Sequence, residues 1–200
     1  MLQGKEDVLK GDELRTVWTI GHSTLPLDRL IGLLEQHQIE VLVDVRSKPY
    51  SRHVPQFNAP ALRGAASKHA VEYQHMGDSL GGRPPESDFY DREGHVLYSL
   101  LAASPRFQRG IHLLRSLAAD HRAAILCSEE DPSVCHRSLL IGRVLLGEGW
   151  NLMHIRASGG VVPGDELDRS RQTVIFEEPL AWRSIRSVLR EDPLKTSFKR

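Results

Sequence analysis

Residues 122–147 read RAAILCSEEDPSVCHRSLLIGRVLLG, and this stretch decides the fold class. Its first six residues, 122–127, form a short apolar run that is typical of a buried strand. An acidic turn follows, and the apolar residues after it recur at the spacing of one helix face, which predicts a helix over 134–147. The side chains expected to face the core from this helix are Leu139, Leu140, Val144 and Leu145. A buried strand that leads through a turn into an amphipathic helix is the repeating unit of parallel α/β sheets.

The same alternation of strands and helices continues on both sides of this unit. Further strands are predicted at residues 16–20, 40–45, 71–75 and 151–155. Further helices are predicted at residues 27–38, 61–69 and 105–120, with loops at 46–60 and 77–94. We therefore expect an α/β fold, a single three-layer domain in which a mainly parallel sheet is flanked by helices.

The two ends of the chain do not continue this pattern. Residues 1–15 are polar and are predicted to be a flexible extension of the domain at 16–156. Residues 157–200 begin with a segment that contains glycine and proline, and they are predicted to be an appendage that packs on the domain. Within this appendage, a strand is expected at 173–176 and an amphipathic stretch at 180–190.

Composition excludes several classes of protein. Hydrophobic residues make up 40% and charged residues 26% of the chain, so neither a disordered chain nor a coiled coil is expected. Lys+Arg and Asp+Glu are both 26, and the net charge of zero leaves only a local basic patch for a polyanion. No apolar run approaches the ~20 residues that span a bilayer, so no membrane partner is expected. The charged N-terminus and the two cysteines predict a cytoplasmic protein with reduced thiols and no disulfide.

Reactive side chains follow the predicted strands, at the point where each strand ends. His22 and Ser23 follow the first strand, Asp44 and Arg46 end the second, His75 ends the third, Cys127 and Glu129 end the fourth, and Cys135, His136 and Arg137 open the next helix. Because the carboxyl ends of parallel strands meet at one edge of a sheet, these side chains are expected to share one site. The alternative is that polar residues simply follow the strands, as they do in every α/β protein.

The leading interpretation of this edge is a site for a phosphate-bearing substrate. Arg46 and Arg137 would bind phosphate, and Glu129, Asp44 and His22 would do acid-base catalysis. Further contacts to the substrate are expected from Ser23, Arg52, His75, Gly81, Gly82, Cys135 and His136. The competing interpretations are internal to the protein: an ion pair between Asp44 and Arg46, and a capped helix in which Glu129 pairs with Arg137.

Cys127, Cys135 and His136 also raise the question of a metal site. Ligand pairs in structural zinc sites are usually about two to four residues apart, whereas seven residues separate the two cysteines. A complete ligand set would therefore need His22 or His75 to approach in three dimensions. No cofactor and no metal ligand is assigned from the sequence, and zinc remains a minor alternative.

Taken in order, the short motifs at the strand ends form a recognisable set. They are Thr19-Ile-Gly-His-Ser23, Asp44-Val-Arg46 with Pro49 and Ser51-Arg52, Tyr73 and His75 before Leu80-Gly-Gly82, and Cys127-Ser-Glu129 with Cys135-His-Arg137. This set resembles the domain-of-unknown-function 488 family over about residues 16–156. The resemblance implies a single α/β domain, and because the family is defined without an activity it implies no reaction.

Three functions remain open from the sequence. The first is an enzyme acting on a phosphate-bearing substrate, a nucleotide or nucleic acid, by hydrolase or glycosidic-bond chemistry. The second is a non-catalytic module that binds nucleic acid or a small anion through the same edge. The third is a metal- or thiol-dependent protein that uses Cys127, Cys135 and His136. In each case the stretch 77–94 is expected to form a mobile flap over the edge, and the oligomeric state is not predicted.

Overall fold

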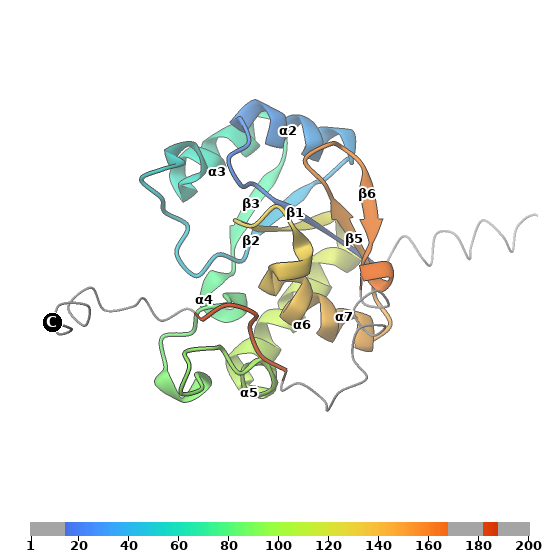
Figure 1. Ribbon diagram of the computed structural model, residues 1–200. Coiled ribbons are helices and arrows are strands. Elements are labelled where there is room, and N and C mark those ends of the chain that lie inside the picture. Colours follow the sequence, from blue (N-terminus) through green and yellow to red (C-terminus); the bar gives the residue numbers. More distant parts are fainter. Residues whose placement is uncertain (1–14, 168–181, 188–200) are drawn as a thin grey trace, which may run out of the picture.

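The computed structural model of the chain describes residues 15–167 and 182–187. One six-stranded sheet forms its centre, with the strand order β3-β2-β4-β1-β5-β6 (Figure 1). The strands are β1 (Thr16–Gly21), β2 (Val41–Asp44), β3 (Glu72–His75), β4 (Ala123–Cys127), β5 (Asn151–Ile155) and β6 (Val161–Pro163). Strands β1 to β5 run parallel and β6 runs antiparallel to β5, so the predicted mainly parallel sheet is confirmed.

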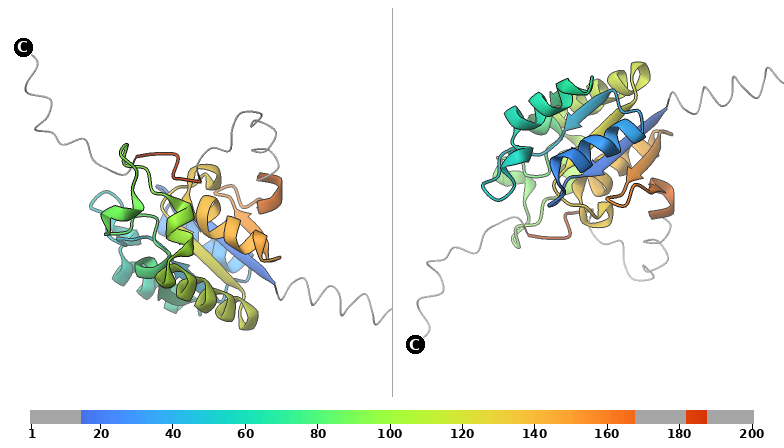
Figure 2. Two further views of the ribbon diagram at one scale, coloured as in Figure 1. Left: turned by 90° about the horizontal axis from the view of Figure 1, so that it is seen from below. Right: turned by 90° about the horizontal axis from the view of Figure 1, so that it is seen from above.

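Helices cover both faces of the sheet and complete the three predicted layers (Figure 2). Helices α2 and α3 lie on one face, and α5, α6 and α7 lie on the other. The α-helices are α2 (Leu27–Gln36), α3 (Ala59–Lys68), α4 (Gly77–Leu80), α5 (Tyr98–Ala103), α6 (Pro105–Asp120) and α7 (Arg143–Gly147). Shorter 3₁₀ turns lie at Pro55–Phe57, Ser87–Phe89 and Pro132–Val134, and a π-helical segment covers Arg137–Gly142. No helix in the described part of the chain is long and apolar enough to cross a membrane.

Alternation of side chains along the buried strands produces two apolar layers. Val43 and Ile125 point to the side of α5, α6 and α7, whereas Leu42 and Leu126 point to the side of α2 and α3. All four side chains are fully buried, and burial of each contributes on the order of 1.5–3 kcal/mol of transfer free energy. Burial on both faces explains why these strands are continuous apolar runs in the sequence.

Strands β1 and β4 lie side by side, and the chain leaves them in opposite directions. Gly21 at the end of β1 pairs with Cys127 at the end of β4. The amide of His22 donates to the Cys127 carbonyl over 3.0 Å, and the amide of Ser23 donates to the Ser128 carbonyl over 2.8 Å, so the two turns are joined. From β1 the chain continues into α2 on one face, and from β4 it continues into α7 on the other. In open α/β sheets, ligands bind beyond the carboxyl ends of the strands at such a switch point.

The segment predicted as a helix over 134–147 is helical, but it is not a single α-helix. A 3₁₀ turn ends at Val134, the π-helical segment begins at Arg137, and α7 begins only at Arg143. Periodicity predicted one helix because apolar residues of this segment, such as Leu140, face the core in either geometry. A π-helical turn is wider than an α turn and is frequent at functional sites. In this protein it carries the buried side chain of Arg137.

Besides α4, which lies in the predicted loop 77–94, two α-helices were not predicted in full. Helix α3 begins at Ala59, inside the predicted loop 46–60, because Pro60 is compatible with the first helical turn. Helix α5 was not predicted at all. It spans only six residues, Tyr98–Ala103, which is too short for a clear apolar period.

The stretch 77–94, predicted as a flap with few apolar anchors, is anchored in the structure. Its first four residues form α4, and Leu80 at the end of that helix is fully buried. Pro84 is also buried, and Phe89 and Tyr90 pack against the core. The premise that this stretch has few apolar anchors is therefore wrong, whereas its mobility as a flap stays a prediction.

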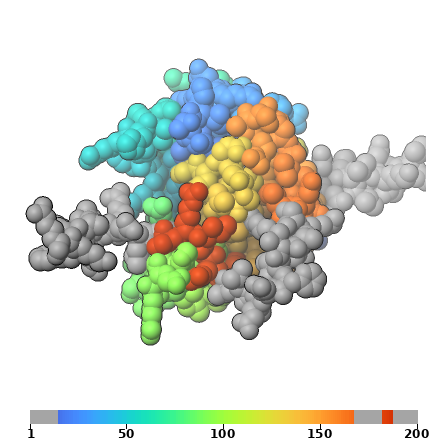
Figure 3. Space-filling view, in the orientation of Figure 1, coloured from blue at the N-terminus to red at the C-terminus, as the bar shows by residue number. Residues whose placement is uncertain are grey.

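Part of the predicted appendage at 157–200 belongs to the domain itself. Strand β6 extends the central sheet by pairing with β5. The short segment 182–187 lies on the surface of the domain (Figure 3), where the indole Nε1 of Trp182 donates to the Leu139 carbonyl over 2.8 Å. The predicted strand at 173–176 and the predicted extension up to residue 14 lie outside the described residues.

Candidate functional site

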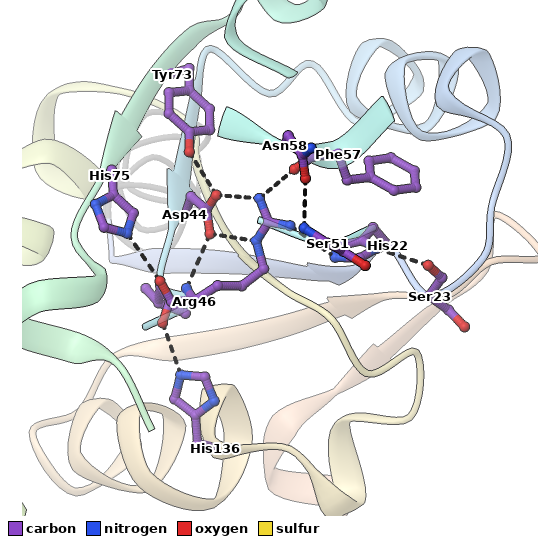
Figure 4. Close-up of polar contacts among 11 residues, drawn as sticks. His22, Ser23, Asp44, Arg46, Ser51, Phe57, Asn58, Tyr73, His75 and His136 are labelled. Atoms are coloured by element: carbon purple, nitrogen blue, oxygen red, sulfur yellow. Dashed lines mark hydrogen bonds and ion pairs between the residues drawn. The ribbon is translucent and has the colours of Figure 1, made fainter. Parts of the chain in front are cut away.

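A buried ion pair between Asp44 and Arg46 occupies the carboxyl end of β2 (Figure 4). The Arg46 Nε lies 2.9 Å from Asp44 Oδ1, and the second terminal nitrogen lies 2.6 Å from Asp44 Oδ2. Only 6% of Arg46 and none of Asp44 is exposed. A bidentate pair with this geometry is a strong, charge-assisted contact. The internal ion pair that the sequence left as an alternative is therefore present.

The remaining groups around this pair are also used internally. Tyr73 donates its hydroxyl proton to Asp44 Oδ2 over 2.7 Å, and Arg46 donates to the Phe57 carbonyl over 2.7 Å. Arg46 Nη1 lies 3.1 Å from His22 Nε2. The Nδ1 of His22 lies 2.8 Å from the Ser23 carbonyl, which can only accept, so Nδ1 carries the proton and Nε2 accepts from Arg46. We call His22, Asp44, Arg46 and Tyr73 the arginine network.

Burial and pairing determine the protonation states in the arginine network. Burial lowers the pKa of His22, and the positive charge of Arg46 lowers it further, although the hydrogen bond to the Ser23 carbonyl acts in the opposite sense. The His22 ring also stacks on Phe57 at 4.4 Å between ring centres. Burial and the hydrogen bond to Asp44 both raise the pKa of Tyr73. His22 is therefore neutral and fixed in one tautomer, which suits a structural role better than proton transfer.

Arg137 is fully buried and holds the turn that follows β4. Its guanidinium donates to the backbone carbonyls of Glu129 and Glu130, the latter over 2.6 Å, and its Nε donates to Thr19 Oγ1 over 3.3 Å. The expected phosphate contact is therefore not supported by the geometry. The alternative pairing with Glu129 is present in a different form, because Arg137 contacts the Glu129 carbonyl and not its carboxylate.

A second cluster lies beside this turn and contains Cys127, Glu129, Cys135 and His136, which we call the thiol-carboxylate cluster. The Glu129 Oε2 lies 3.0 Å from the Sγ of Cys127 and 3.1 Å from the Sγ of Cys135. The Nδ1 of His136 lies 3.5 Å from the Cys127 sulfur and 4.0 Å from the Cys135 sulfur. All four potential ligand atoms lie within 4.8 Å of one another. Both cysteines are buried free thiols.

The fold positions each member of this cluster through the backbone. Cys127 is the last residue of β4, and Arg137 holds the turn so that Glu129 and Cys135 face it. The Nε2 of His136 lies 3.3 Å from the Val45 carbonyl and donates to it, which leaves the lone pair of Nδ1 directed at the sulfur atoms. A histidine that ligates a metal almost always donates its other ring nitrogen in this way.

The four side chains of the thiol-carboxylate cluster could hold a metal ion. Tetrahedral bonds of about 2.0–2.3 Å imply distances of about 3.3–3.8 Å between ligand atoms. The distances from Glu129 and His136 to the two sulfur atoms are 3.0, 3.1, 3.5 and 4.0 Å, so one lies within this range and the other three lie within about 0.3 Å of it. Two thiols and an imidazole are also the ligands that zinc prefers. The sequence spacing of the two cysteines argued against a zinc site, because the spacing rule assumes two ligands that are close together in the sequence.

The electrostatics of the thiol-carboxylate cluster favour a positive charge. Burial alone would raise the pKa of Glu129, but the hydrogen bonds from the two thiols outweigh it and lower that pKa to about 2. Burial raises the pKa of the Cys135 thiol well above its usual range. Burial alone would lower the pKa of His136, but its contact with Cys135 and the charge of Glu129 raise it. The carboxylate is thus negative at neutral pH and faces groups that gain from a nearby cation.

The other residues predicted for the site take supporting or peripheral places. His75 donates from Nε2 to the Arg46 carbonyl over 3.0 Å. Ser23 adopts the left-handed region with φ of 42°, and its amide is used by the Ser128 carbonyl, so an anion cradle at this turn is not supported. Gly82 lies against His136 of the thiol-carboxylate cluster, Gly81 lies against Gly77 and Ser47, and Arg52 is exposed.

Four groups that matter were not predicted as site residues: Thr19, Val45, Phe57 and Tyr73. Val45 and Phe57 act through their backbone carbonyls, which sequence patterns do not reveal. Tyr73 could have been found from strand register, because Leu42 pairs with Tyr73 and places Asp44 two residues further along the same face. Thr19 could have been noted as a hydroxyl in the centre of an apolar strand.

Comparison with known protein families identifies the family to which this chain belongs. The sequence profile described as "Domain of unknown function DUF488" matches residues 26–144, which is more than half of the 200-residue chain. The chain belongs to the DUF488 family. No curated protein and no solved structure gives a significant match. The DUF488 match includes the whole thiol-carboxylate cluster, together with Asp44, Arg46 and Tyr73.

Proposed function

We propose that this DUF488 protein is a metal-dependent enzyme of the hydrolase type. Cys127, Cys135 and His136 would hold a zinc ion, and Glu129 would serve as the acid-base group beside it. The convergence of four ligand atoms within 4.8 Å carries this proposal. The proposal combines two expectations from the sequence, namely the acid-base role of Glu129 and the metal site that was left as an alternative.

Three ligands of this kind suit a catalytic zinc better than a structural one. Structural sites use four cysteine or histidine ligands, whereas catalytic sites use three protein ligands and keep a fourth position open. When bound, zinc supplies Lewis-acid chemistry and activates water for attack. Glu129 is the member of the cluster with a carboxylate, and its Oε2 lies next to both sulfur ligands, where it can accept a proton.

The place in the fold supports the same conclusion. The thiol-carboxylate cluster lies at the carboxyl end of β4, beside the switch point between β1 and β4, where α/β proteins bind their ligands. Zinc binding needs two reduced thiols, which agrees with the cytoplasmic location expected from the cysteine content. Since Arg46 and Arg137 are both committed to internal partners, phosphate groups of a substrate would have to meet other cations.

Cobalt loading tests the metal site directly. The chain is expected to bind one Co²⁺ and to show a sulfur-to-cobalt charge-transfer band in the near ultraviolet. The double variant Cys127→Ser/Cys135→Ser removes both cysteines of the chain and should abolish that band. Ser128→Ala, at the exposed position after Cys127, is the matched control and should keep it. No cobalt uptake by the unmodified chain would refute the proposal.

Glu129→Gln separates the acid-base role from a ligand role. The variant should keep cobalt and its charge-transfer band, while hydrolysis of bis(p-nitrophenyl) phosphate by the zinc-loaded chain should be abolished. Loss of the metal in this variant would make Glu129 a ligand and remove the acid-base assignment. Metal binding without hydrolysis by the unmodified chain would favour a non-catalytic binding module.

A further inference from the structure

The segment between Asp44 and Glu72 contains no acidic residue, although the whole chain is electrically neutral. Its lysines and arginines are Arg46, Lys48, Arg52, Arg63 and Lys68. Of these, Arg46 is neutralised by Asp44, whereas Lys48 and Arg52 are exposed. The beginning of the segment therefore forms a local excess of positive charge that overall composition conceals.

The loop 47–58, which begins this segment, presents an exposed aromatic ring between the cations. Tyr50 is 68% exposed, between Lys48 on one side and Arg52 on the other. An exposed aromatic ring that is flanked in the sequence by two cations can stack on an unpaired base while the cations meet the phosphate backbone. His53, next to Arg52, is also exposed.

The loop is held in place by its own hydrogen bonds. The Ser51 amide donates to Asn58 Oδ1 over 2.6 Å, and the amides of His53 and Val54 donate to Ser51 Oγ over 3.1 and 3.3 Å. The Pro49 carbonyl accepts from the first amide of α3 over 3.0 Å. The exposed side chains thus project from a pre-organised backbone, which lowers the entropy lost when a ligand binds.

This basic loop begins at the thiol-carboxylate cluster. The Val45 carbonyl, two residues before the loop, accepts from His136 of the cluster over 3.3 Å. Ser47 Oγ accepts from the amide of Arg83, a further exposed cation, over 3.0 Å. The loop lies in the cyan part of the chain that projects from the domain in Figure 3, and the chain then enters α3. A chain-like ligand lying on it would have one end at the cluster.

We infer that the basic loop, with Lys48, Tyr50 and Arg52, binds single-stranded nucleic acid and leads it toward the thiol-carboxylate cluster. This inference rests on the proposed function only in making the bound strand the substrate. Cations on a groove or loop bind the phosphate backbone, and aromatic rings stack on bases that are free of pairing. A strand matches the spaced arrangement of cation, ring and cation better than a single small anion does.

The test is fluorescence anisotropy of the full chain with a labelled oligothymidylate of about 12 nucleotides. At about 50 mM salt the unmodified chain should bind it, and Lys48→Ala/Arg52→Ala should bind about tenfold more weakly. The dependence of log affinity on log salt should fall by about 1.4 in that variant, since each phosphate contact contributes about 0.7. Lys68→Ala/Arg109→Ala removes the same charge from exposed helix positions and should bind as the unmodified chain does.

Two further measurements separate strand binding from simple charge attraction. Tyr50→Ala should weaken binding about tenfold while Tyr50→Trp restores it, because stacking needs the ring and not the hydroxyl. Polyglutamate should compete poorly. Equal losses in both double variants, no rescue by tryptophan, or equal competition by polyglutamate at the same charge would overturn the inference.

Zinc content, measured on the same samples, keeps this inference distinct from the proposed function. The loop variants should retain one zinc per chain, because none of the substituted side chains belongs to the thiol-carboxylate cluster. Strand binding without any metal would refute the proposed function and leave the loop as a binding surface. One zinc per chain with no strand binding would overturn this inference alone.

Discussion

The arginine network and the thiol-carboxylate cluster share a border, and they differ in how completely the protein satisfies them. In the arginine network, strong donors meet strong acceptors at 2.6 to 3.1 Å, and the charge of Arg46 is cancelled by Asp44. In the thiol-carboxylate cluster, weak S–H donors share one carboxylate, and an imidazole lone pair faces sulfur. The first cluster is complete without a ligand, whereas the second gains from a cation. A closed ion pair therefore characterises the framework of this protein, whereas a carboxylate that faces two thiols characterises its candidate site.

The largest expected effect comes from breaking the arginine network. Asp44→Asn leaves the buried Arg46 without its counter-ion and should lower the free energy of unfolding by about 3–5 kcal/mol, as measured by urea denaturation. Asp28→Asn, at an exposed position of α2, should change it by less than about 0.5 kcal/mol.

Replacing both partners sharpens the same comparison. Asp44→Leu/Arg46→Met removes the whole ion pair and should cost less than Asp44→Asn alone, since no unpaired charge remains. Folded Asp44→Asn protein should still take up cobalt, because its side chain lies outside the thiol-carboxylate cluster. A mild effect of Asp44→Asn would contradict the division between framework and site.

The next effect comes from the metal. Zinc at 100 times its dissociation constant should stabilise the chain by about 2.7 kcal/mol, seen as a rise in Tm that a chelator reverses. Cys127→Ser/Cys135→Ser should remove this increment. In the absence of metal, the Tm of that variant should lie close to that of the unmodified chain. Equal zinc-dependent shifts in both proteins would show that the ion binds elsewhere.

The comparison of the arginine network with the thiol-carboxylate cluster also shows which features could be predicted from the sequence. The β-α alternation predicted the positions of the first five strands and their parallel direction, because buried parallel strands need unbroken apolar runs, but it did not predict their order in the sheet. Position at a strand end also indicated His22, Asp44, Arg46, Glu129 and His136 as neighbours, and the first three do contact one another. What periodicity could not show was the π-helical segment, or the short helix α5.

The roles within the site were harder to foretell than the positions. Arg137 looks like an anion ligand in sequence, but its partners are backbone carbonyls, which every residue has. The cysteines were discounted as a metal pair because of their spacing, whereas the turn after β4 folds back and brings Cys135 within 3.1 Å of the same carboxylate oxygen as Cys127. Contacts made through a folded-back turn do not follow local spacing rules.

A smaller effect is expected where the backbone approaches the thiol-carboxylate cluster. A Cβ atom on Gly82 would lie 2.6 Å from Cγ of His136, so Gly82→Ala must displace the imidazole. Zinc affinity should fall about tenfold or more, as it does when groups that orient a ligand are changed. Gly64→Ala, whose Cβ meets nothing within 4 Å, is the matched control and should leave zinc affinity unchanged. Competition with a chromophoric chelator measures the zinc affinities of both variants. Equal affinities would show that zinc binding does not depend on the position of His136 beside Gly82.

The smallest effect is a pH dependence that belongs to the arginine network. Burial lowers the pKa of His22 in the folded chain below its ordinary value of 6.5. As the pH falls through that value, the unfolded chain takes up a proton that the folded chain refuses, so stability is lost toward acid. The raised pKa of His136 contributes with the opposite sign, since its folded form binds the proton more tightly. The informative quantity is therefore the difference in Tm between the unmodified chain and His22→Gln, followed from about pH 8 to 5.5. Relative to the variant, the unmodified chain should lose stability as the pH falls. Parallel curves would contradict the prediction, because they would mean that the pKa of His22 is the same in the folded and unfolded chains.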